Sequence, residues 1–447
     1  MHFINIIFFG GFFMRKRYFL ITFAIITIIA GVWVWSCKHP FGAGIDLTGL
    51  RDYIPMSQQA PGPGYTNEIT YGNNKVIDPT KMFGDKYKVY TNATGMNYRI
   101  PALLTLLNGD ILAFADKRYN DARDLPRKMD VVVKISKDNG TNWGEEKFVT
   151  KPKSTSKNDG SGDTAVVQDR KTGDVIAVVA HGNGFAQSNP KFLIRIMVYR
   201  SKDNGESWQG PVDITSQIYG PGCKDPVRKD WQAAFVTSGN GLQMRNGRIM
   251  FVLNVRDDTT IVKNYVMYSD DGGYKWKVSK GCPYNPRSGN EAKVVELNNG
   301  SLLMHIRWTP YRLQSRSYDK GETWTEATQI TDIPASSSNG DLIVYTSKLN
   351  GYDKDRLITL VDSEPWGSSG ISPGKPVFYV SYDEGKTWKA KKQLYSGAAG
   401  YSSLSILKDG SIGILAELTK QWNGPIWFLR ASIEWVNPDD NPTSPKK

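Results

Sequence analysis

The chain of 447 residues is long enough for one large domain or for two to three ordinary ones, and 12% of its residues are aromatic, with 13 Trp, 22 Tyr and 43 Gly. This composition excludes disorder for most of the chain and favours one large globular domain of many short strands and tight turns. The net charge of +12 is compatible with an anionic ligand, but the basic residues are scattered and accompany no nucleic-acid motif, so no nucleic-acid partner is expected.

Residues 1–37 have the pattern of a signal peptide, or of a lipoprotein or membrane anchor. Three basic residues at positions 15–17 precede the uncharged apolar run YFLITFAIITIIAGVWVWS, which ends just before Cys37. The residues before Cys37 loosely resemble a bacterial lipoprotein cleavage site, whose cysteine is acylated and becomes the new N-terminus. We therefore expect export, either as a lipoprotein of the periplasm, outer membrane or cell surface or as a secreted protein. An uncleaved single-span anchor is the alternative.

Residues 38–75 are rich in Gly, Pro and polar side chains (FGAGIDLTG, QQAPGPGY), which predicts a flexible tether, so membrane contact is expected only through the N-terminal segment. The folded domain is expected at 76–437 and a polar C-terminal tail at 438–447. Cys223 and Cys282 lie within the domain. An oxidising compartment would allow them to pair, and the alternative is two buried free thiols.

The motif Ser-x-Asp-x-Gly-x-x-Trp occurs five times in this domain, beginning at residues 136, 201, 269, 317 and 381. Each copy follows an alternating apolar stretch, such as DVVVKIS or IRIMVYRS, and precedes another strand-like stretch, which predicts the turn of a β-hairpin. In such a turn Asp can accept hydrogen bonds from backbone N–H groups, Gly can take a positive φ, and Trp can pack on neighbouring strands. A calcium loop is the alternative, but the copies lack its further acidic ligands and terminal Glu.

Hairpin patterns such as ALLTLLNGDILAFAD and GRIMFVLNV fill the rest of the domain, and helical patterning is nearly absent. The five motif copies begin 48 to 68 residues apart, and a motif that recurs at such intervals is typical of propellers, solenoids and other repeat arrays. Five blades marked by the motif, with one more that is degenerate or shared between the two ends of the domain, would close a ring. The sequence therefore predicts an all-β fold, a six-bladed β-propeller, with an antiparallel sandwich or a solenoid as the alternative.

The stretch NYRIPALL at residues 97–104, followed by the repeated turns, resembles the exo-sialidase (neuraminidase) family of retaining glycoside hydrolases over residues 80–435. The resemblance implies a propeller with its active site on the central axis and the repeated turns, the Asp-boxes, on the outer rim. It also implies sialylated glycans as partners and no metal or organic cofactor, and we expect a monomer. With four histidines and no HExxH, CxxC or Gly-x-Ser-x-Gly motif, zinc and Ser-His-Asp catalysis have no candidates.

A sialic acid carries a carboxylate on its anomeric carbon, and planar guanidinium groups can meet both oxygens of that carboxylate in a fixed fork. Arg99 in YRIPALL and Arg307 in LLMHIRW match two of the three arginines of the family. The third would fall in the stretch SEPWGSSGISPGKPVFYV, where no arginine stands and Lys375 is the nearest cation. Because lysine supplies a point charge without the planar fork, its presence leaves open which sugar acid is bound and whether the protein is catalytically active.

Three residues match the catalytic groups of the family. Tyr401 in AAGYSSLSILKDG matches the nucleophile, Glu291 in SGNEAKVVEL its base, and Asp124 in RYNDARDLP the acid/base that protonates the leaving oxygen, with Asp121 as the competitor. A neutral phenol avoids the repulsion that an attacking carboxylate would meet beside the carboxylate of the substrate. Its pKa near 10 requires a base within reach, and this Tyr–Glu pair is a recognised exception to the two-carboxylate scheme of glycosidases.

Three more positions match residues that shape the pocket. Arg118 matches an additional pocket arginine, Asp163 an acid that lines the same pocket, and Glu417 in GILAE the glutamate that orients Arg99. The function that follows from the resemblance is an exo-α-sialidase with a retaining mechanism. Two alternatives remain: a non-catalytic glycan-binding propeller, motivated by the missing third arginine, and a hydrolase of a related 2-keto sugar acid.

Overall fold

The computed structural model describes residues 76–442, except 151–157, 258–260, 284–288, 337, 364–373, 420–423 and 441. The expected export segment at 1–37 and the expected tether at 38–75 lie outside these residues. Among the residues described, there is no helix with the length and apolar character needed to span a bilayer.

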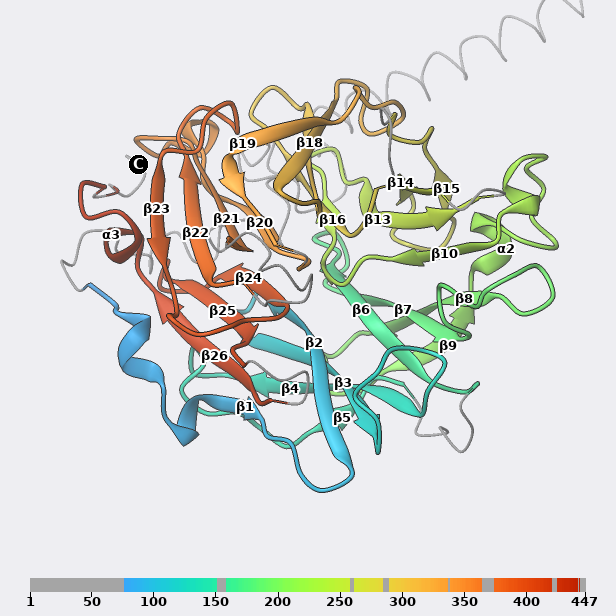
Figure 1. Ribbon diagram of the computed structural model, residues 1–447, viewed down its shortest axis with the longest axis horizontal. Coiled ribbons are helices and arrows are strands. Elements are labelled where there is room, and N and C mark those ends of the chain that lie inside the picture. Colours follow the sequence, from blue (N-terminus) through green and yellow to red (C-terminus); the bar gives the residue numbers. More distant parts are fainter. Residues whose placement is uncertain are drawn as a thin grey trace, which may run out of the picture. The chain divides into compact units, whose positions relative to one another are not determined.

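The described strands form six sheets that follow one another as blades around a ring, so the predicted six-bladed β-propeller is confirmed (Figure 1). In blades 1 and 2 the strands are β2 (Met96–Thr105), β3 (Ile111–Tyr119), β4 (Met129–Ser136) and β5 (Lys147–Phe148), then β6 (Ser161–Gln168), β7 (Val175–Gly182), β8 (Ile194–Ser201) and β9 (Gln209–Asp213). In blades 3 and 4 they are β10 (Ala233–Val236), β12 (Leu242–Gln243), β13 (Ile249–Arg256), β14 (Val262–Ser269) and β15 (Lys277–Val278), then β16 (Ala292–Glu296), β17 (Leu302–Ile306), β18 (Tyr311–Ser317) and β19 (Thr328–Pro334).

Blades 5 and 6 complete the ring. Their strands are β20 (Asp341–Thr346), β21 (Arg356–Asp362), β22 (Pro376–Ser381) and β23 (Ala390–Gln393), then β24 (Ser402–Ile406), β25 (Ile412–Glu417), β26 (Ile426–Ala431) and β1 (Lys88–Tyr90). Pairing within the blades is antiparallel, and the short β11 (Gly239–Asn240) joins blade 2 by parallel pairing with β6. The helices are short: η3 (Pro79–Met82), η4 (Asp85–Tyr87), α2 (Thr215–Ile218), η5 (Arg228–Asp230), η6 (Lys348–Asn350) and α3 (Ile433–Val436).

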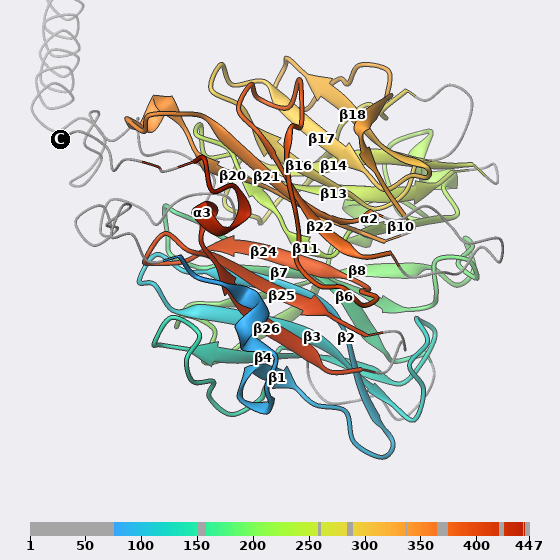
Figure 2. The same cartoon turned by 60° about the vertical axis from the view of Figure 1, so that its left-hand side comes forward.

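The ring is closed by pairing between the two ends of the domain. Strand β1 precedes blade 1 in the chain, yet it pairs antiparallel with β26, with Lys88 opposite Trp427 and Tyr90 opposite Ile426. Figure 2 shows β1, in blue, beside the red strands of blade 6. The sixth blade is therefore shared between the ends of the domain, which is one of the two possibilities that the sequence leaves open, and this closure joins the last blade to the start of the domain.

The five Asp-boxes form the turns between the third and the outermost strand of blades 1 to 5. In the first box Ser136 Oγ donates to Asp138 Oδ1 over 2.9 Å, Gly140 N donates to Ser136 Oγ over 2.9 Å, and Asn142 N donates to Asp138 Oδ1 over 2.8 Å. The same serine and aspartate contacts recur in the other four boxes. The boxes are thus hydrogen-bonded turns on the outer side of the blades, away from the axis.

Each box also packs against the preceding blade. A side chain on Gly140 would lie 2.0 Å from the ring of Phe428 in blade 6, and one on Gly205 would lie 2.7 Å from Leu112 in blade 1. The indole of Trp143 meets the same Phe428 edge-on, with the ring centroids 5.1 Å apart. Glycine is therefore required both for its positive φ and for close approach, and the boxes join neighbouring blades at the rim.

The residue before each box glycine also has a positive φ. In the fourth box this residue is Lys320, whose φ of 61° is energetically unfavourable for a residue with a long side chain. Lys320 is exposed, and it contributes its backbone oxygen to Arg248 Nη1. Since asparagine occupies the left-handed region more readily, Lys320→Asn is expected to raise the free energy of unfolding by about 0.5–1 kcal/mol, measured by urea denaturation. The control is Lys202→Asn, at an exposed box position whose φ is not positive, where no gain is expected. Equal gains at both positions would contradict the conformational explanation.

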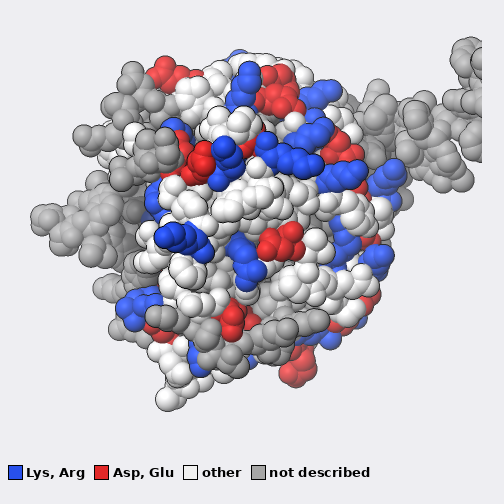
Figure 3. Space-filling view, turned by 90° about the vertical axis from the view of Figure 1, so that its right-hand side faces the viewer, with Lys and Arg blue, Asp and Glu red and all other residues white. Residues whose placement is uncertain are grey.

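The domain continues past residue 437, the boundary expected from sequence. Asp440 is buried and accepts hydrogen bonds from Arg356 Nη2 over 2.6 Å and from Tyr382 Oη over 2.7 Å, so this part of the chain packs on blade 5. Cys223 and Cys282 are both buried free thiols, so the disulfide between them is not formed. On the side of the ring shown in Figure 3, basic and acidic side chains are interspersed.

Candidate active site

Tyr401 and Glu291 meet across the ring although 110 residues separate them. Each directly precedes an innermost strand, Tyr401 before β24 and Glu291 before β16. The Tyr401 hydroxyl lies 2.7 Å from both Oε1 and Oε2 of Glu291. Burial raises the pKa of the Tyr401 phenol well above its usual value, although Arg307 opposes this shift. The phenol is therefore neutral in the resting protein and already hydrogen-bonded to a base that could take its proton.

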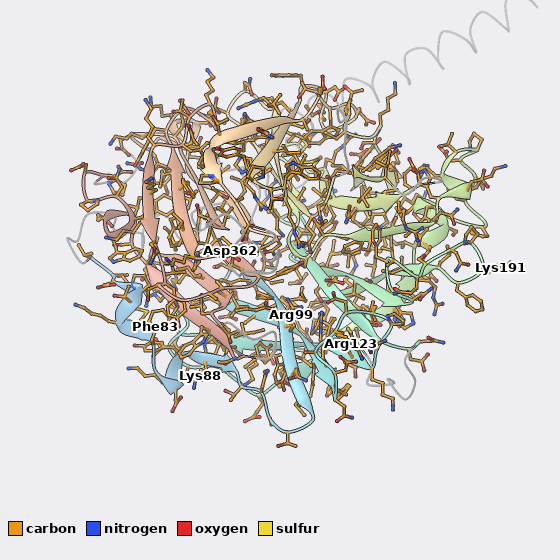
Figure 4. All side chains as sticks on the ribbon, in the orientation of Figure 1. Phe83, Lys88, Arg99, Arg123, Lys191 and Asp362 are labelled. Atoms are coloured by element: carbon orange, nitrogen blue, oxygen red, sulfur yellow. The ribbon has the colours of Figure 1, made fainter. Side chains whose placement is uncertain are left out.

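Two guanidinium groups flank the Tyr401 ring, with the Cζ atoms of Arg99 and Arg307 lying 5.5 Å and 5.9 Å from its centroid. Arg307 Nη1 donates to Glu291 Oε2 over 2.5 Å and to the Tyr401 hydroxyl over 2.9 Å. Figure 4 shows Arg99 near the middle of the ring, whereas Lys88 and Lys191 lie at its edge. The two cations predicted to bind a carboxylate thus stand beside the predicted nucleophile.

Glu417 connects Arg99 to the backbone of Tyr401. Its Oε2 accepts from Arg99 Nη2 over 3.1 Å and from Tyr401 N over 3.1 Å, and its Oε1 accepts from Ile100 N over 2.8 Å. Ile100 lies at a β-bulge in β2 and has φ of 59°, a strained conformation for a β-branched residue. The bulge aims Arg99 toward the axis, and Glu417 holds that strained turn in place.

Asp124 lies at the mouth of the pocket, where its side chain is 62% exposed. Arg118 Nη1 donates to its Oδ1 over 2.8 Å, and Arg99 Nη1 lies 3.8 Å from the same atom. The partial loss of hydration inside the pocket would by itself raise the pKa of Asp124, but the charges of Arg118 and Arg99 outweigh that effect and hold it below its usual value. The competitor, Asp121, is paired with Arg123 and Arg127 instead.

Arg118 is fully buried and is held by a second acid, Asp116, that sequence reasoning missed. Arg118 Nη2 donates to Asp116 Oδ2 over 2.9 Å, and Asp163 N donates to Asp116 Oδ1 over 3.0 Å. Burial raises the pKa of Asp116 to about 6 despite the opposing charge of Arg118. Asp116 stands two residues before Arg118 on β3, so both side chains lie on one face of the sheet, and that spacing is the signal that could have found it.

Asp163 lies at a second bulge, in β6, where its φ is 53°. Burial raises the pKa of its carboxyl well above the usual value, and the neighbouring charges of Asp116 and Asp124 raise it further. The folded protein therefore keeps this proton over a pH range in which the unfolded chain has lost it. The stability that this proton contributes is present below the unfolded pKa of about 3.9 and is lost as the pH rises through the folded pKa.

Asp163→Asn should remove this pH dependence, because asparagine has no proton to lose and tolerates a positive φ equally well. We expect the stability of the variant relative to the wild type to increase between pH 4.5 and pH 8, as measured by urea unfolding. The control is Asp121→Asn, since hydrogen bonds from Arg123 lower the pKa of Asp121 and give the opposite sign. That variant should lose stability at neutral pH and recover relative to the wild type as the pH falls.

A cavity of about 310 Å³ is lined by five of the predicted residues, Asp124, Asp163, Glu291, Arg307 and Tyr401. These five residues form its polar wall together with Asn290, and the rest comes mostly from blades 2 and 3 and is largely apolar. The lining residues are Asp124, Leu125, Asp163, Phe185, Ile194, Phe235, Asn254, Val262, Gly289, Asn290, Glu291, Arg307 and Tyr401. Within the described part of the chain there is no cluster of three or more His, Cys, Asp or Glu side chains suited to a metal ion.

Ser338 and Asn339, which lie just before β20, hold the backbone on either side of Tyr401, and sequence reasoning missed both. Ser338 Oγ donates to the carbonyl oxygen of Gly400 over 2.8 Å. The Asn339 side chain accepts from Ser402 N over 3.3 Å and donates to Ser402 O over 3.4 Å. They stand in a Ser- and Asn-rich turn that the sequence marks only as a loop. The backbone on both sides of the phenol is therefore fixed by residues that lead into blade 5.

The third-arginine position falls mostly in 364–373, outside the described residues. Lys375, the nearest cation in sequence, lies just before β22, and its carbonyl oxygen accepts from Ser363 N over 2.9 Å. A buried cation, Arg312, donates to the carbonyl oxygen of Ser338 over 2.9 Å and also to that of Asn339. Burial lowers its pKa to about 10. Because its guanidinium binds backbone carbonyls, Arg312 braces the loop beside Tyr401 and does not replace the missing fork.

The structure thus brings all eight residues predicted from the sequence into one connected network. Three of them, Tyr401, Glu291 and Arg307, form a hydrogen-bonded triangle. Asp124 and Arg118 form an ion pair that reaches Arg99 at 3.8 Å. The remaining members are Glu417 beside Arg99 and Asp163 beside the Asp116–Arg118 pair.

Comparison with known proteins identifies a matching domain family and several similar sialidases. Residues 100–363 match the model of the BNR repeat-like domain. A sialidase from Paraclostridium sordellii is 30% identical over 369 residues, which is 77% of this chain and 86% of that protein. A sialidase from Bacteroides fragilis is 29% identical over 403 residues, or 83% of this chain and 71% of that protein. The solved structure of the Hadza microbial sialidase Hz136 superposes with a TM-score of 0.65 at 28% identity, covering 76% of this chain and 66% of that one.

Proposed function

The chain belongs to the bacterial sialidase family and is a glycoside hydrolase, and we propose that it removes terminal sialic acids from glycans with retention of the anomeric configuration. Arg99 and Arg307 bind the carboxylate of the sugar acid. The anomeric carbon is then held beside the phenol oxygen of Tyr401. This binding mode is supported by the two guanidinium groups that flank the Tyr401 ring at 5.5 Å and 5.9 Å.

In the first step Glu291 takes the proton of the Tyr401 hydroxyl as the phenol oxygen attacks the anomeric carbon. The bond from that carbon to the glycosidic oxygen breaks, and Asp124 gives its proton to the departing oxygen. The product is a tyrosyl glycoside and a free alcohol. The raised pKa of Tyr401 supports this order of events, since removing the proton in advance would be costly and a base at 2.7 Å can take it during the attack.

In the second step Asp124, now a carboxylate, takes a proton from water as that water attacks the same carbon. The bond to Tyr401 breaks, and the phenolate recovers its proton from Glu291. Two inversions give net retention, and every proton returns to its starting group. Arg307 contacts both Glu291 and the Tyr401 hydroxyl, so it can offset the negative charge that passes between them.

The observation that carries the proposal is the 2.7 Å contact of the Tyr401 hydroxyl with Glu291 between two arginines. It is tested by incubating the protein with an aryl α-sialoside and following the released sugar acid by proton NMR. The α-anomer should appear first and then mutarotate. Initial release of the β-anomer would indicate a single displacement by water and would contradict the tyrosyl intermediate.

The missing arginine between residues 363 and 380 favours a second candidate, a hydrolase of a related 2-keto sugar acid. A carboxylate that is bound by two guanidinium groups instead of three is held less rigidly. The other substituents of the sugar ring then contribute more to the choice of substrate. Comparison of kcat/KM for aryl glycosides of sialic acid and of other 2-keto sugar acids distinguishes the two. Glycan binding without turnover of any of them would instead support the non-catalytic propeller.

A further inference from the structure

The wall of the cavity formed by blades 2 and 3 is apolar except for one amide. Phe185 and Phe235 meet edge-on with their ring centroids 5.1 Å apart, and Ile194 and Val262 extend the same wall. Asn254 lies among these side chains and is only 4% exposed. An amide in such surroundings loses its hydration, which is costly unless it gains a hydrogen bond.

Asn254 lies on β13, in register with Phe235 on β10 and with Asn264 on β14. Directly opposed residues on neighbouring strands share one face of a sheet, so the three side chains form a row. The amide of Asn264 donates to the carbonyl oxygen of Asn290 over 2.6 Å and is thereby engaged within the protein. Asn254 Oδ1, in contrast, is buried and has no hydrogen-bond partner among the described residues.

An unpaired buried amide oxygen costs about 1–3 kcal/mol, so folding alone gives no reason for an asparagine at this position. A ligand that fills the cavity and offers an N–H or O–H group there would remove the penalty. The reacting carbon must lie between Tyr401 and Asp124, with the carboxylate of the sugar beside Arg99 and Arg307. The part of the substrate that reaches Asn254 is therefore the part away from the carboxylate.

We propose that Asn254 is a specificity-determining residue that accepts a hydrogen bond from an N–H or O–H donor on the part of the sugar acid away from its carboxylate. The proposal rests on the proposed function. Two donors have this chemistry, the acylamino N–H on the ring and the hydroxyls of the polyhydroxylated side chain. The surrounding aromatic wall strengthens the selection, because a substrate without the donor leaves the amide unpaired in an apolar site.

The test compares the full chain with Asn254→Leu, which removes the acceptor at similar volume, and with Asn254→Asp, which keeps an acceptor oxygen. The substrates are aryl α-glycosides of N-acetylneuraminic acid, of its analogue lacking the acylamino group, and of its analogue with a truncated side chain. Asn254→Leu should lower kcat/KM about 10- to 100-fold on the parent substrate and should have no effect on the analogue that lacks the donor. Asn254→Asp should retain more activity on the parent than Asn254→Leu.

A second readout separates this inference from the proposed function. Binding of 2,3-didehydro-2-deoxy-N-acetylneuraminic acid, measured by calorimetry, requires no turnover and should weaken about 10- to 100-fold in Asn254→Leu. If the wild type binds this compound but hydrolyses nothing, the proposed function fails while the role of Asn254 is still tested. Equal losses on all three substrates, or unchanged binding in a folded Asn254→Leu variant, would overturn the inference. Thermal unfolding of each variant establishes that it is folded.

Discussion

Tyr401→Phe is expected to lower kcat/KM on an aryl α-sialoside by about a thousandfold or more while the protein stays folded. The phenol oxygen is the atom that forms the bond to the anomeric carbon, and phenylalanine offers no substitute. Folding should survive because Arg307 Nη1 still contacts Glu291 Oε2 at 2.5 Å after the hydroxyl is lost. Steady-state kinetics and thermal unfolding measure the two effects separately.

The matched control for this change is Tyr382→Phe, which also removes a tyrosine hydroxyl. That hydroxyl donates to Asp440 over 2.7 Å, on the outer side of blade 5, so its loss should leave kcat/KM unchanged. Glu291→Gln should slow the reaction about 10²- to 10⁴-fold, and the double variant should be little worse than Tyr401→Phe, because the two side chains act in one step. Near-normal rates in Tyr401→Phe would remove the phenol from the mechanism.

Asp124→Ala is expected to slow release of an alcohol from a natural glycan about 10²- to 10⁴-fold, and release of a nitrophenol from an aryl sialoside far less. A nitrophenolate departs without a proton, whereas an alkoxide does not. The ratio of the two rates therefore isolates the acid function of Asp124 from its effect on binding. If Asp121→Asn gave the leaving-group effect and Asp124→Ala did not, the assignment would pass to Asp121.

The pH profile of the wild type gives an independent check on Asp124. The guanidinium groups of Arg118 and Arg99 hold its pKa below the usual value in the free protein. A substrate carboxylate bound at Arg99 offsets part of that positive charge, so the pKa of Asp124 should rise on binding. Because the acid must be protonated to act, the basic limb of the kcat profile should lie at higher pH than that of kcat/KM. Coincident limbs would argue against this coupling.

The fold could be predicted from the sequence because its signals are local. Each Asp-box contains the serine, aspartate and glycine that make its turn, and strand alternation before and after it gives the blade. The site residues were found by resemblance, through short stretches such as the one around Arg99. For the fold and for the site, the residues that give the signal are neighbours in the chain. The number of predicted blades then indicates a closed ring of six.

The other features of the site could not be predicted, because they depend on contacts between strands that are far apart in the chain. The role of Asn254 follows from its place opposite Phe235 on another strand and from the lack of a partner for its oxygen. In the sequence Arg312 resembles an ordinary strand residue, and only its hydrogen bonds to the carbonyl oxygens of Ser338 and Asn339 show that it holds the loop beside Tyr401. Burial and pairing of this kind are tertiary effects, and no local pattern encodes them.

Ring closure also decides when the protein can become active during synthesis. Arg99 and its partner Glu417 are 318 residues apart, and β1 cannot pair with its partner strand until β26 has been made. At typical elongation rates this interval is on the order of tens of seconds, during which a nascent chain carries an unpaired strand edge and an unoriented arginine. The pairing that orients Arg99 can therefore form only after the last blade has been made.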